Sequence, residues 1–226
     1  MKFEIIENEN FAALKVSLKK GEAVKAESGA MLSMDSHINV EGKMEGGLLS
    51  GLGRMLAGET IFIQTISATD KAGEVILAPT NIGSIIEIEI DKNTVWNVSK
   101  GGFFAADEGI EVSNKLQNLA RGMFSGEGFF VLKISGTGKF FISSFGAVIK
   151  KEIKKGEDYI VDNFHLVAWN SDAQIDIQKA SSSWLNSFKS GEGLVTKITG
   201  PATVYIQTRN PKSFGGWLSG VLPSKK

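Results

Sequence analysis

Hydrophobic and polar residues alternate along several short segments of this chain. Between Ile85 and Ile90, isoleucines interleave with Glu87 and Glu89, which is the period-two pattern of a strand with one buried face. Similar strand-length segments lie at 62–66, 129–134, 140–144 and 204–208. Four prolines and 26 glycines indicate that glycine makes most of the turns. The pattern predicts a nearly all-β protein of many short strands.

A Gly-Glu pair that precedes a strand occurs three times, with its glycine at Gly58, Gly126 and Gly191, at spacings of 68 and 65 residues. Two further apolar strands precede each pair, and residues 133–142 match 197–206 at a constant offset of 64. Such near-constant intervals indicate repeated structural units. We therefore predict one compact domain of three diverged β-sandwich units, arranged with pseudo-threefold symmetry or as stacked layers. The predicted units span approximately 1–91, 92–156 and 157–226.

The segment before each Gly-Glu pair differs from the strands around it. In the second unit, an apolar stripe has the spacing of an amphipathic helix and comprises Leu116, Leu119, Ala120, Met123 and Phe124. In the first unit, the corresponding run 46–56 contains four glycines, each of which costs about 1 kcal/mol in a helix relative to alanine. We expect a short helix in the second unit and a loop or a strained hairpin in the first.

Composition excludes several classes of function. The 25 basic residues balance 25 acidic ones, so bulk charge favours neither nucleic acid nor an anionic surface, although a local patch is compatible with this balance. The chain has no cysteine, which excludes disulfides, thiolate nucleophiles and zinc–thiolate sites. No apolar run suits a signal peptide or reaches the roughly 20 residues of a spanning helix. We expect a cytoplasmic protein that does not bind nucleic acid.

Few residues are suited to catalysis or metal binding. The two histidines, His37 and His165, fall at different points of their units, whereas a metal site needs several converging imidazole or carboxylate ligands. We therefore predict no catalytic residue, no metal site and no cofactor. Glu59, Glu127 and Glu192 recur in every unit, which indicates either a ring of carboxylates around a cation or, as we favour, a shared turn.

Two glycine-rich apolar segments, 46–56 and 214–222, share the pattern Gly-Gly-apolar-Leu-Ser-Gly. If exposed, they form an apolar patch of the kind that binds a partner or a membrane surface. If buried, they belong to the core or to a subunit interface. The candidate interaction residues are Leu48, Leu49, Leu52, Arg54, Trp217 and Leu218.

The run 46–59, followed by Ile-Phe-Ile-Gln at 61–64, resembles the hallmark of the altered inheritance of mitochondria protein 24 family. Ser-Gly-Ala-Met at 28–31 and Gly-Thr-Gly at 136–138 resemble it as well. The resemblance covers nearly the whole chain. It implies a double-stranded β-helix fold grouped with the tryptophan RNA-binding attenuation protein, and a family without agreed catalytic residues. Function follows from sites and not from folds, so we infer no binding of RNA or tryptophan.

The leading functional hypothesis is a non-catalytic scaffold or interaction protein. It predicts a homo-oligomer, with a trimer favoured, that offers its apolar segments to a protein partner or a membrane surface. The alternative is a small-molecule-binding module with a pocket at the unit interfaces, lined by Trp96, Phe103, Phe104 and Trp169. A third possibility is an enzyme with paired carboxylates, drawn from Asp35, Asp107 and Glu108.

Overall fold

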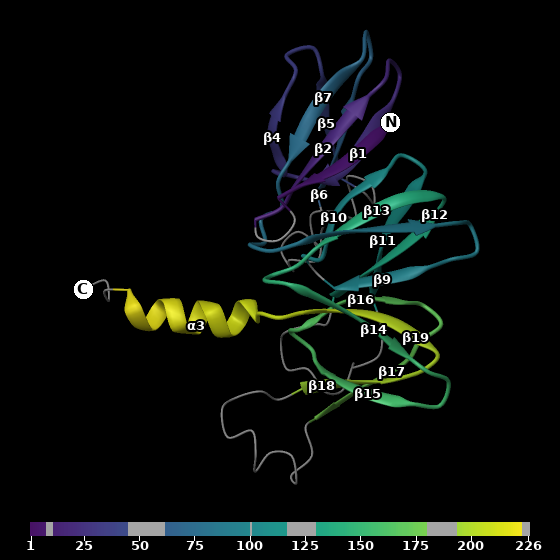
Figure 1. The fold of residues 1–226 in the computed structure, drawn as a ribbon, viewed down its shortest axis with the longest axis vertical. Coiled ribbons are helices and arrows are strands. Elements are labelled where there is room, and N and C mark those ends of the chain that lie inside the picture. Colours follow the sequence, from purple (N-terminus) through teal and green to yellow (C-terminus); the bar gives the residue numbers. More distant parts are fainter. Residues whose placement is uncertain (8–10, 45–61, 100, 117–129, 180–193, 223–226) are drawn as a thin grey trace.

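The computed structural model describes residues 1–7, 11–44, 62–99, 101–116, 130–179 and 194–222 (Figure 1). These residues form antiparallel β-sheets and one helix, α3 (Pro211–Val221). The nearly all-β class predicted from the alternation is therefore confirmed. The alternating segment that led to the prediction is β8 (Ile85–Ile90), in which Glu87 and Glu89 are exposed and three of the isoleucines are buried.

The described strands build four sheets. The first has the order β1-β2-β7-β4, with β1 (Lys2–Ile6), β2 (Ala13–Leu18), β7 (Gly73–Leu77) and β4 (Met31–Met34). The second has the order β5-β6-β3-β10-β13-β8, with β5 (Asn39–Met44), β6 (Phe62–Ser67), β3 (Ala23–Glu27), β10 (Phe103–Asp107) and β13 (Gly138–Ser143). The third has the order β11-β12-β9-β16-β19-β14, with β11 (Ile110–Leu116), β12 (Phe130–Gly136), β9 (Trp96–Ser99), β16 (Leu166–Asn170), β19 (Ala202–Gln207) and β14 (Val148–Ile153). The fourth has the order β15-β18-β17, with β15 (Asp158–Asp162), β18 (Leu194–Thr199) and β17 (Gln174–Lys179).

The sheets are stacked along the long axis of the molecule, from the purple and blue strands of the first sheet to the green strands of the fourth (Figure 1). Three hydrophobic cores lie along this stack, and each joins two successive sheets. The first core contains Leu14 and Phe104, the second contains Trp96 and Phe103, and the third contains Trp169 and Ile198. The chain is thus held together by apolar side chains from neighbouring sheets.

The second and third sheets are covered on both faces, and the side chains of their central strands point into two different cores. Phe103 and Phe140 lie in the second core, whereas their neighbours Phe104 and Phe141 point into the first. Because successive side chains of a strand point to opposite faces, a strand between two cores is apolar at every position. In contrast, β2 alternates between fully and partly buried residues because one of its faces lies against a core.

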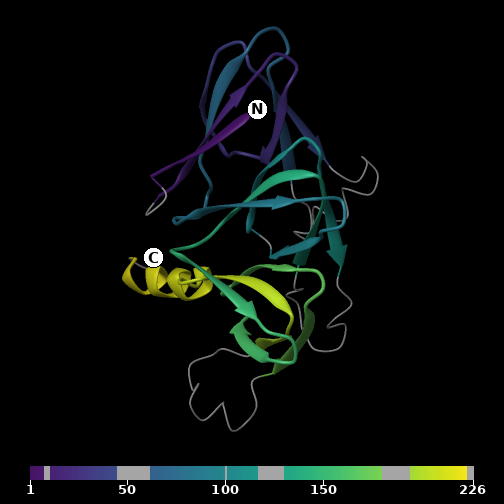
Figure 2. The same cartoon turned by 45° about the vertical axis from the view of Figure 1, so that its right-hand side comes forward.

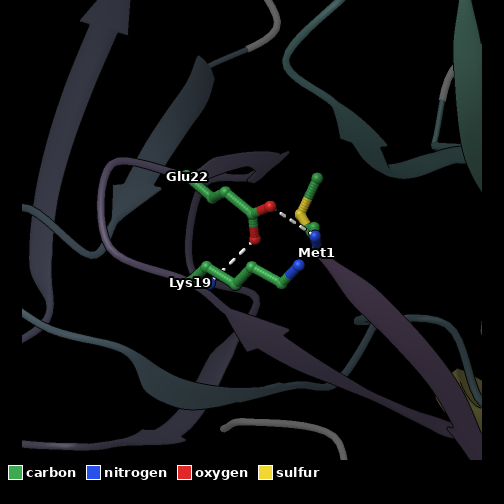
Figure 3. Close-up of polar contacts among 3 residues, drawn as sticks. All are labelled: Met1, Lys19 and Glu22. Carbon is green, nitrogen blue, oxygen red and sulfur yellow. Dashed lines mark hydrogen bonds and ion pairs between the residues drawn. The ribbon is translucent and has the colours of Figure 1, made fainter.

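A tight turn joins β2 to β3. Gly21 in this turn has a φ of 83°, a left-handed conformation that glycine adopts without strain. The Glu22 carboxylate accepts the backbone N–H of Lys19 at 2.8 Å and pairs with the amino group of Met1 at 2.6 Å (Figure 3). Glu22 therefore closes the turn and ties the start of β1 to it.

The same tetrapeptide, Lys-Lys-Gly-Glu, forms the turn 154–157 between β14 and β15. Gly156 has a φ of 80°, and the Glu157 carboxylate accepts the backbone N–H of Lys154 at 3.2 Å. Both turns connect a strand of one sheet to a strand of the next sheet. One short sequence thus builds the same structure at two places in the stack.

The strand orders of the second and third sheets are related in a simple way. Each strand number in the third sheet is six higher than the number at the same position in the second. In the first sheet, β2-β7-β4 corresponds to β8-β13-β10, and the fourth sheet, β15-β18-β17, corresponds to β3-β6-β5. β4 and β15 lie at opposite ends of the stack (Figure 1). The described sheets form a linear series, so the predicted pseudo-threefold symmetry is not confirmed.

Some predicted features fall on residues that the structure does not describe. These are the three Gly-Glu pairs, the run 46–56 and four of the five positions of the predicted amphipathic stripe. The fifth position, Leu116, is not helical: it ends β11 and pairs with Phe130 of β12. There the strand pairing uses backbone groups that a helix would have bonded internally, so the helix prediction is wrong for this residue.

Candidate functional site

Two of the six candidate interaction residues lie in α3. The exposed fractions of Trp217 and Leu218 are 62% and 37%. The segment 214–222 is therefore not part of the core of this chain. The other four candidates, Leu48, Leu49, Leu52 and Arg54, lie outside the described residues.

α3 begins at a complete N-cap. The side-chain oxygen of the buried Asn210 accepts two backbone N–H groups of the first turn, that of Lys212 at 2.9 Å. Pro211 occupies the start of the helix, where its missing N–H needs no partner. The Phe214 ring meets the edge of Phe145, with 5.2 Å between the ring centroids. These contacts fix the first turn of the helix next to the end of β19 and to the connection between β13 and β14.

Beyond its first turn, α3 projects away from the sheets (Figures 1 and 2). No residue of the helix is buried. The exposed apolar residues at its surface have the i, i+3, i+4, i+7 and i+8 spacing of one helix face and are Phe214, Trp217, Leu218, Val221 and Leu222, the last being the C-cap. No helix in the described ranges has both the length and the apolar character that crossing a bilayer requires.

β4 forms the second exposed apolar region. It pairs with β7 on one side, and no described strand pairs with its other side. Met31, Leu32 and Met34 are all exposed, and the strand contains no charged residue. An apolar strand edge of this kind presents free backbone groups and apolar side chains to a further strand.

β15 forms the third exposed region, at the opposite end of the stack. It pairs with β18 on one side, and no strand of the described ranges pairs with the other. Tyr159 and Ile160 are exposed at its centre. At its start, an ion pair with Lys197 at 2.8 Å and a hydrogen bond from the Thr199 hydroxyl lower the pKa of Asp158. The charge of Asp158 is thus compensated within the chain.

β4 has a shift in its pairing register, and β10 and β16 have corresponding shifts. The pairing of each of these strands with its neighbour shifts by one residue at the same point, and the shifts are flanked by Met31 and Ser33, by Phe103 and Ala105, and by Leu166 and Ala168. The residues inside the shifts are Leu32, Phe104 and Val167, with exposed fractions of 63%, 0% and 2%. β10 and β16 are covered by β3 and β9 on the side where β4 is open. Phe104 and Val167 lie in cores that join their own sheet to the preceding one, whereas no described sheet precedes the first, so the exposure of Leu32 follows from an uncovered end of the stack.

Two of the three carboxylates considered for an enzyme accept backbone hydrogen bonds at strand ends. Asp107 accepts a backbone N–H of β13 at 2.6 Å, and Asp35 accepts a backbone N–H of β7 at 2.9 Å. Asn170 makes the corresponding contact with β19 at 2.7 Å. Because a neutral amide fills the same role after β16, these contacts require an acceptor oxygen and not a negative charge. The third carboxylate, Glu108, is exposed in the turn after β10.

The two histidines each contact a backbone carbonyl. His37 donates its Nε2–H to the Ala72 oxygen at 3.0 Å, and His165 donates its Nδ1–H to the Gln207 oxygen at 2.7 Å. A carbonyl oxygen can only accept, so these ring nitrogens carry the protons. Among the described residues, no three His, Asp or Glu side chains gather in a way that could hold a metal ion.

The four aromatic residues of the predicted pocket are core residues. Phe104 lies in the first core, Trp96 and Phe103 lie in the second, and Trp169 lies in the third. All four are buried. They are therefore distributed along the stack and do not line a common site.

The sequence carried one unused signal for this arrangement. Lys-Lys-Gly-Glu occurs at 19–22 and again at 154–157, and each copy directly precedes a strand, β3 or β15. Aligning these copies would have matched β3 with β15. The exposed residues Tyr159 and Ile160 themselves had no such signal, because a buried and an exposed apolar strand have the same composition.

Comparisons with known proteins agree with the fold. Residues 3–209 match the model of the family described as Mitochondrial biogenesis AIM24. An uncharacterized protein of Streptococcus pyogenes serotype M6 is 31% identical over 232 residues, covering 99% of this chain and 92% of that protein. The crystal structure of a Streptococcus pyogenes protein superposes with a TM-score of 0.80 at 29% identity, covering 98% of this chain and 99% of that chain. This chain therefore belongs to the Mitochondrial biogenesis AIM24 family.

Proposed function

We propose that this protein is a non-catalytic scaffold that assembles head to tail, with β4 of one copy paired to β15 of the next. The observation that carries the proposal is the pairing of the corresponding strands within the chain: β10 pairs with β3, and β16 pairs with β9. An intermolecular β4–β15 pair would create the order β17-β18-β15-β4-β7-β2. This order corresponds to that of the second and third sheets.

The proposal treats the chain as three diverged copies of one six-stranded unit. The strand orders, the three register shifts and the strand-end acceptors Asp35, Asp107 and Asn170 support this interpretation. The predicted boundaries after residues 91 and 156 fall in corresponding turns, between β8 and β9 and between β14 and β15. Within a unit the strands are shared between two sheets, as expected for the double-stranded β-helix that the resemblance implies, and only one pair of successive strands, such as β11 and β12, lies in the same sheet.

The intramolecular pairs also specify the register of the intermolecular pair. Ala105, Ala106 and Asp107 of β10 lie opposite Ala26, Lys25 and Val24 of β3. The register shifts align β4 with β10, and the turn after each strand aligns β15 with β3. Transferred to the free edges, the register places Ser33, Met34 and Asp35 of one copy opposite Val161, Ile160 and Tyr159 of the next.

Apolar burial supplies the driving force for this pairing. The counterparts of Leu32 are fully buried, and burying such a side chain contributes about 1.5–3 kcal/mol. The other six outer strands of the four sheets each carry a charged residue, which opposes pairing with another chain. These residues are Glu4, Glu41, Glu87, Glu111, Lys151 and Asp176. β4 lacks such a charge, and those of β15 lie at its ends.

Head-to-tail pairing leads to a closed ring when the rotation between copies closes, and otherwise to a filament. A closed ring leaves no open β4 or β15 edge. We therefore expect a ring, with the trimer predicted from the sequence as its state. Light scattering coupled to size-exclusion chromatography should then give three times the chain mass of 24.3 kDa.

Charge substitutions at the predicted Met34–Ile160 pair test the interface directly. Met34→Lys and Ile160→Lys should each raise the dissociation constant by about tenfold or more, because each places a charge in an apolar edge. Combining Met34→Lys with Ile160→Glu should restore much of the assembly, since opposite charges directly across a strand pair attract. Combining the two lysines should not.

Val40→Lys is the matched control, because Val40 is an exposed apolar residue on the outer strand β5. Its mass should equal that of the unmodified protein, and circular dichroism should show that all variants are folded. A wild-type protein that remains a 24.3 kDa monomer at micromolar concentration would contradict the proposal. Equal effects of the opposite-charge and like-charge pairs would contradict the register.

A further inference from the structure

We infer that α3 is an interfacial anchor that lies on the surface of an anionic lipid bilayer. The first observation is its uncovered apolar face, formed by Phe214, Trp217, Leu218, Val221 and Leu222. Each copy of the chain carries the complete helix, so the inference does not depend on the assembly proposed above. It names the surface to which the scaffold attaches.

The composition of α3 requires an apolar environment for the helix. It has 11 residues, of which Gly215, Gly216 and Gly220 are poor helix formers, and none is buried. Isolated helices of this length are marginal in water even when they are rich in alanine. Helices of surface-bound proteins gain their stability by inserting an apolar face that contains Trp, Phe and Leu into the interface. The face of α3 has this composition.

The charges around the helix select an anionic surface. Residues 193–226 contain no Asp or Glu, although the whole chain has a net charge of zero. Apart from Lys197 of β18, which pairs with Asp158, the basic residues of this region are Arg209, Lys212, Lys225 and Lys226. Lys212 lies near the side of the helix opposite Trp217 and Val221 by the helical period, so it can contact lipid headgroups while the apolar face is inserted. Basic residues next to an inserted segment are attracted to anionic lipids.

The length and attachment of α3 fit a helix that lies in the plane of the bilayer surface. At 1.5 Å per residue its 11 residues extend about 16 Å, well short of the roughly 30 Å hydrocarbon core. The first turn is held by the Asn210 cap and by the contact of Phe214 with Phe145. Lys212 also lies 5.0 Å above the ring of the exposed Phe164. The helix is thus anchored at its base, and the rest of its apolar face is free to insert.

Vesicle binding tests the inference with the full chain. The protein should sediment with vesicles of equal parts phosphatidylglycerol and phosphatidylcholine, bind vesicles of phosphatidylcholine alone less, and dissociate as salt is raised. The double variant Trp217→Ser with Leu218→Ser should lower the partition coefficient by about tenfold or more. Ile149→Ser, at an exposed apolar position of β14, is the matched control and should bind like the unmodified protein.

Tryptophan fluorescence measures whether α3 inserts into the bilayer surface. Trp96 and Trp169 are buried whereas Trp217 is exposed, so insertion should shift the emission of Trp217 to shorter wavelength. Trp217→Phe should keep the binding and lose this shift. The variant Ile160→Lys should still show the shift, with weaker overall binding if assembly adds multivalency. Loss of assembly and loss of membrane binding are therefore measured separately.

Two results would overturn the inference. The first is no binding of the unmodified protein to the anionic vesicles. The second is equal binding by the protein and its Trp217→Ser, Leu218→Ser variant. If the first result came together with a changed oligomeric mass of that variant, a second copy of the chain would be the partner that covers α3.

Discussion

Glu22 connects a local turn to a segment far from it in the sequence. The amino group of Met1, and after it the backbone N–H of Lys19, lower the pKa of this carboxyl. A lowered pKa means that the folded state favours the ionised form. The resulting stability is present above the pKa of Glu22 in the unfolded chain, and it is lost as the pH falls through the pKa of the folded protein.

We expect Glu22→Gln to lower the free energy of unfolding at pH 7 by less than about 1 kcal/mol, because water still reaches and screens this partly buried ion pair. The difference between the variant and the unmodified protein should shrink as the pH falls through the lowered pKa of the folded protein, where the native glutamate also becomes neutral. Urea denaturation at several pH values measures it. Glu41→Gln, at an exposed position of β5, is the control, and a loss of the same size at pH 3 and pH 7 would argue against the charge effect.

Single residues also show the limit of sequence analysis. The sequence predicts two apolar strands before each Gly-Glu pair, and the earlier of the two overlaps β4, β10 or β16. The sequence gives Leu32 and Phe104 the same interpretation. Their opposite exposure depends on whether another sheet packs on that face: residues of the first sheet cover Phe104, whereas no described sheet lies beyond the first.

At the scale of elements, some connections between strands contact one another through isolated backbone bridges. Gly83, between β7 and β8, bridges in parallel to Gly146, between β13 and β14. A Cβ atom on Gly83 would clash with the backbone oxygens of Ser144 and Gly146 and would lie 2.7 Å from the nitrogen of Gly146. Only glycine permits this close approach of two backbones.

Gly83→Ala should therefore lower the free energy of unfolding by more than about 1 kcal/mol, because the backbone atoms that it meets cannot move aside as a flexible side chain would. Gly42→Ala is the matched control, since a Cβ at this exposed position on β5 has open space around it. The control should be neutral or slightly stabilising. Denaturant titration of both variants decides, and equal stability of the two would contradict the prediction.

Elements differ in how well the sequence predicts them. Strands such as β8 and β19 were predicted at nearly their observed positions, because alternation and flanking glycines act over a few residues. α3 is not among the predicted elements, and its three glycines lower helix propensity. Asn210 and Pro211 are start signals that point to it.

For the whole molecule, stacking of four sheets leaves the two ends of the series unlike its middle. The sheets in the middle contain six strands and are covered on both faces, whereas the end sheets contain four and three. The exposed residues of β4 and β15 lie at these ends. Head-to-tail assembly would complete both end sheets at once, and it would couple folding to association.

This coupling predicts a melting temperature that rises with protein concentration, because association of folded copies shifts the folding equilibrium. The Ile160→Lys variant should melt at a lower temperature that does not depend on concentration. Val40→Lys should behave like the unmodified protein. Scanning calorimetry over a wide concentration range measures the effect, and a constant melting temperature of the unmodified protein would contradict the coupling.

The sequence by itself determined the strand-rich class, many of the strand positions and the periodic spacing of their markers. It did so because alternation and glycine turns depend on residues close together in the chain. Only the tertiary structure decided which strands lie at an open edge, since that depends on pairs such as β10 with β3, which are about 80 residues apart. It likewise decided that Trp217 is exposed and Trp169 is buried, because burial is set by the surfaces that packing brings together and not by the side chain itself.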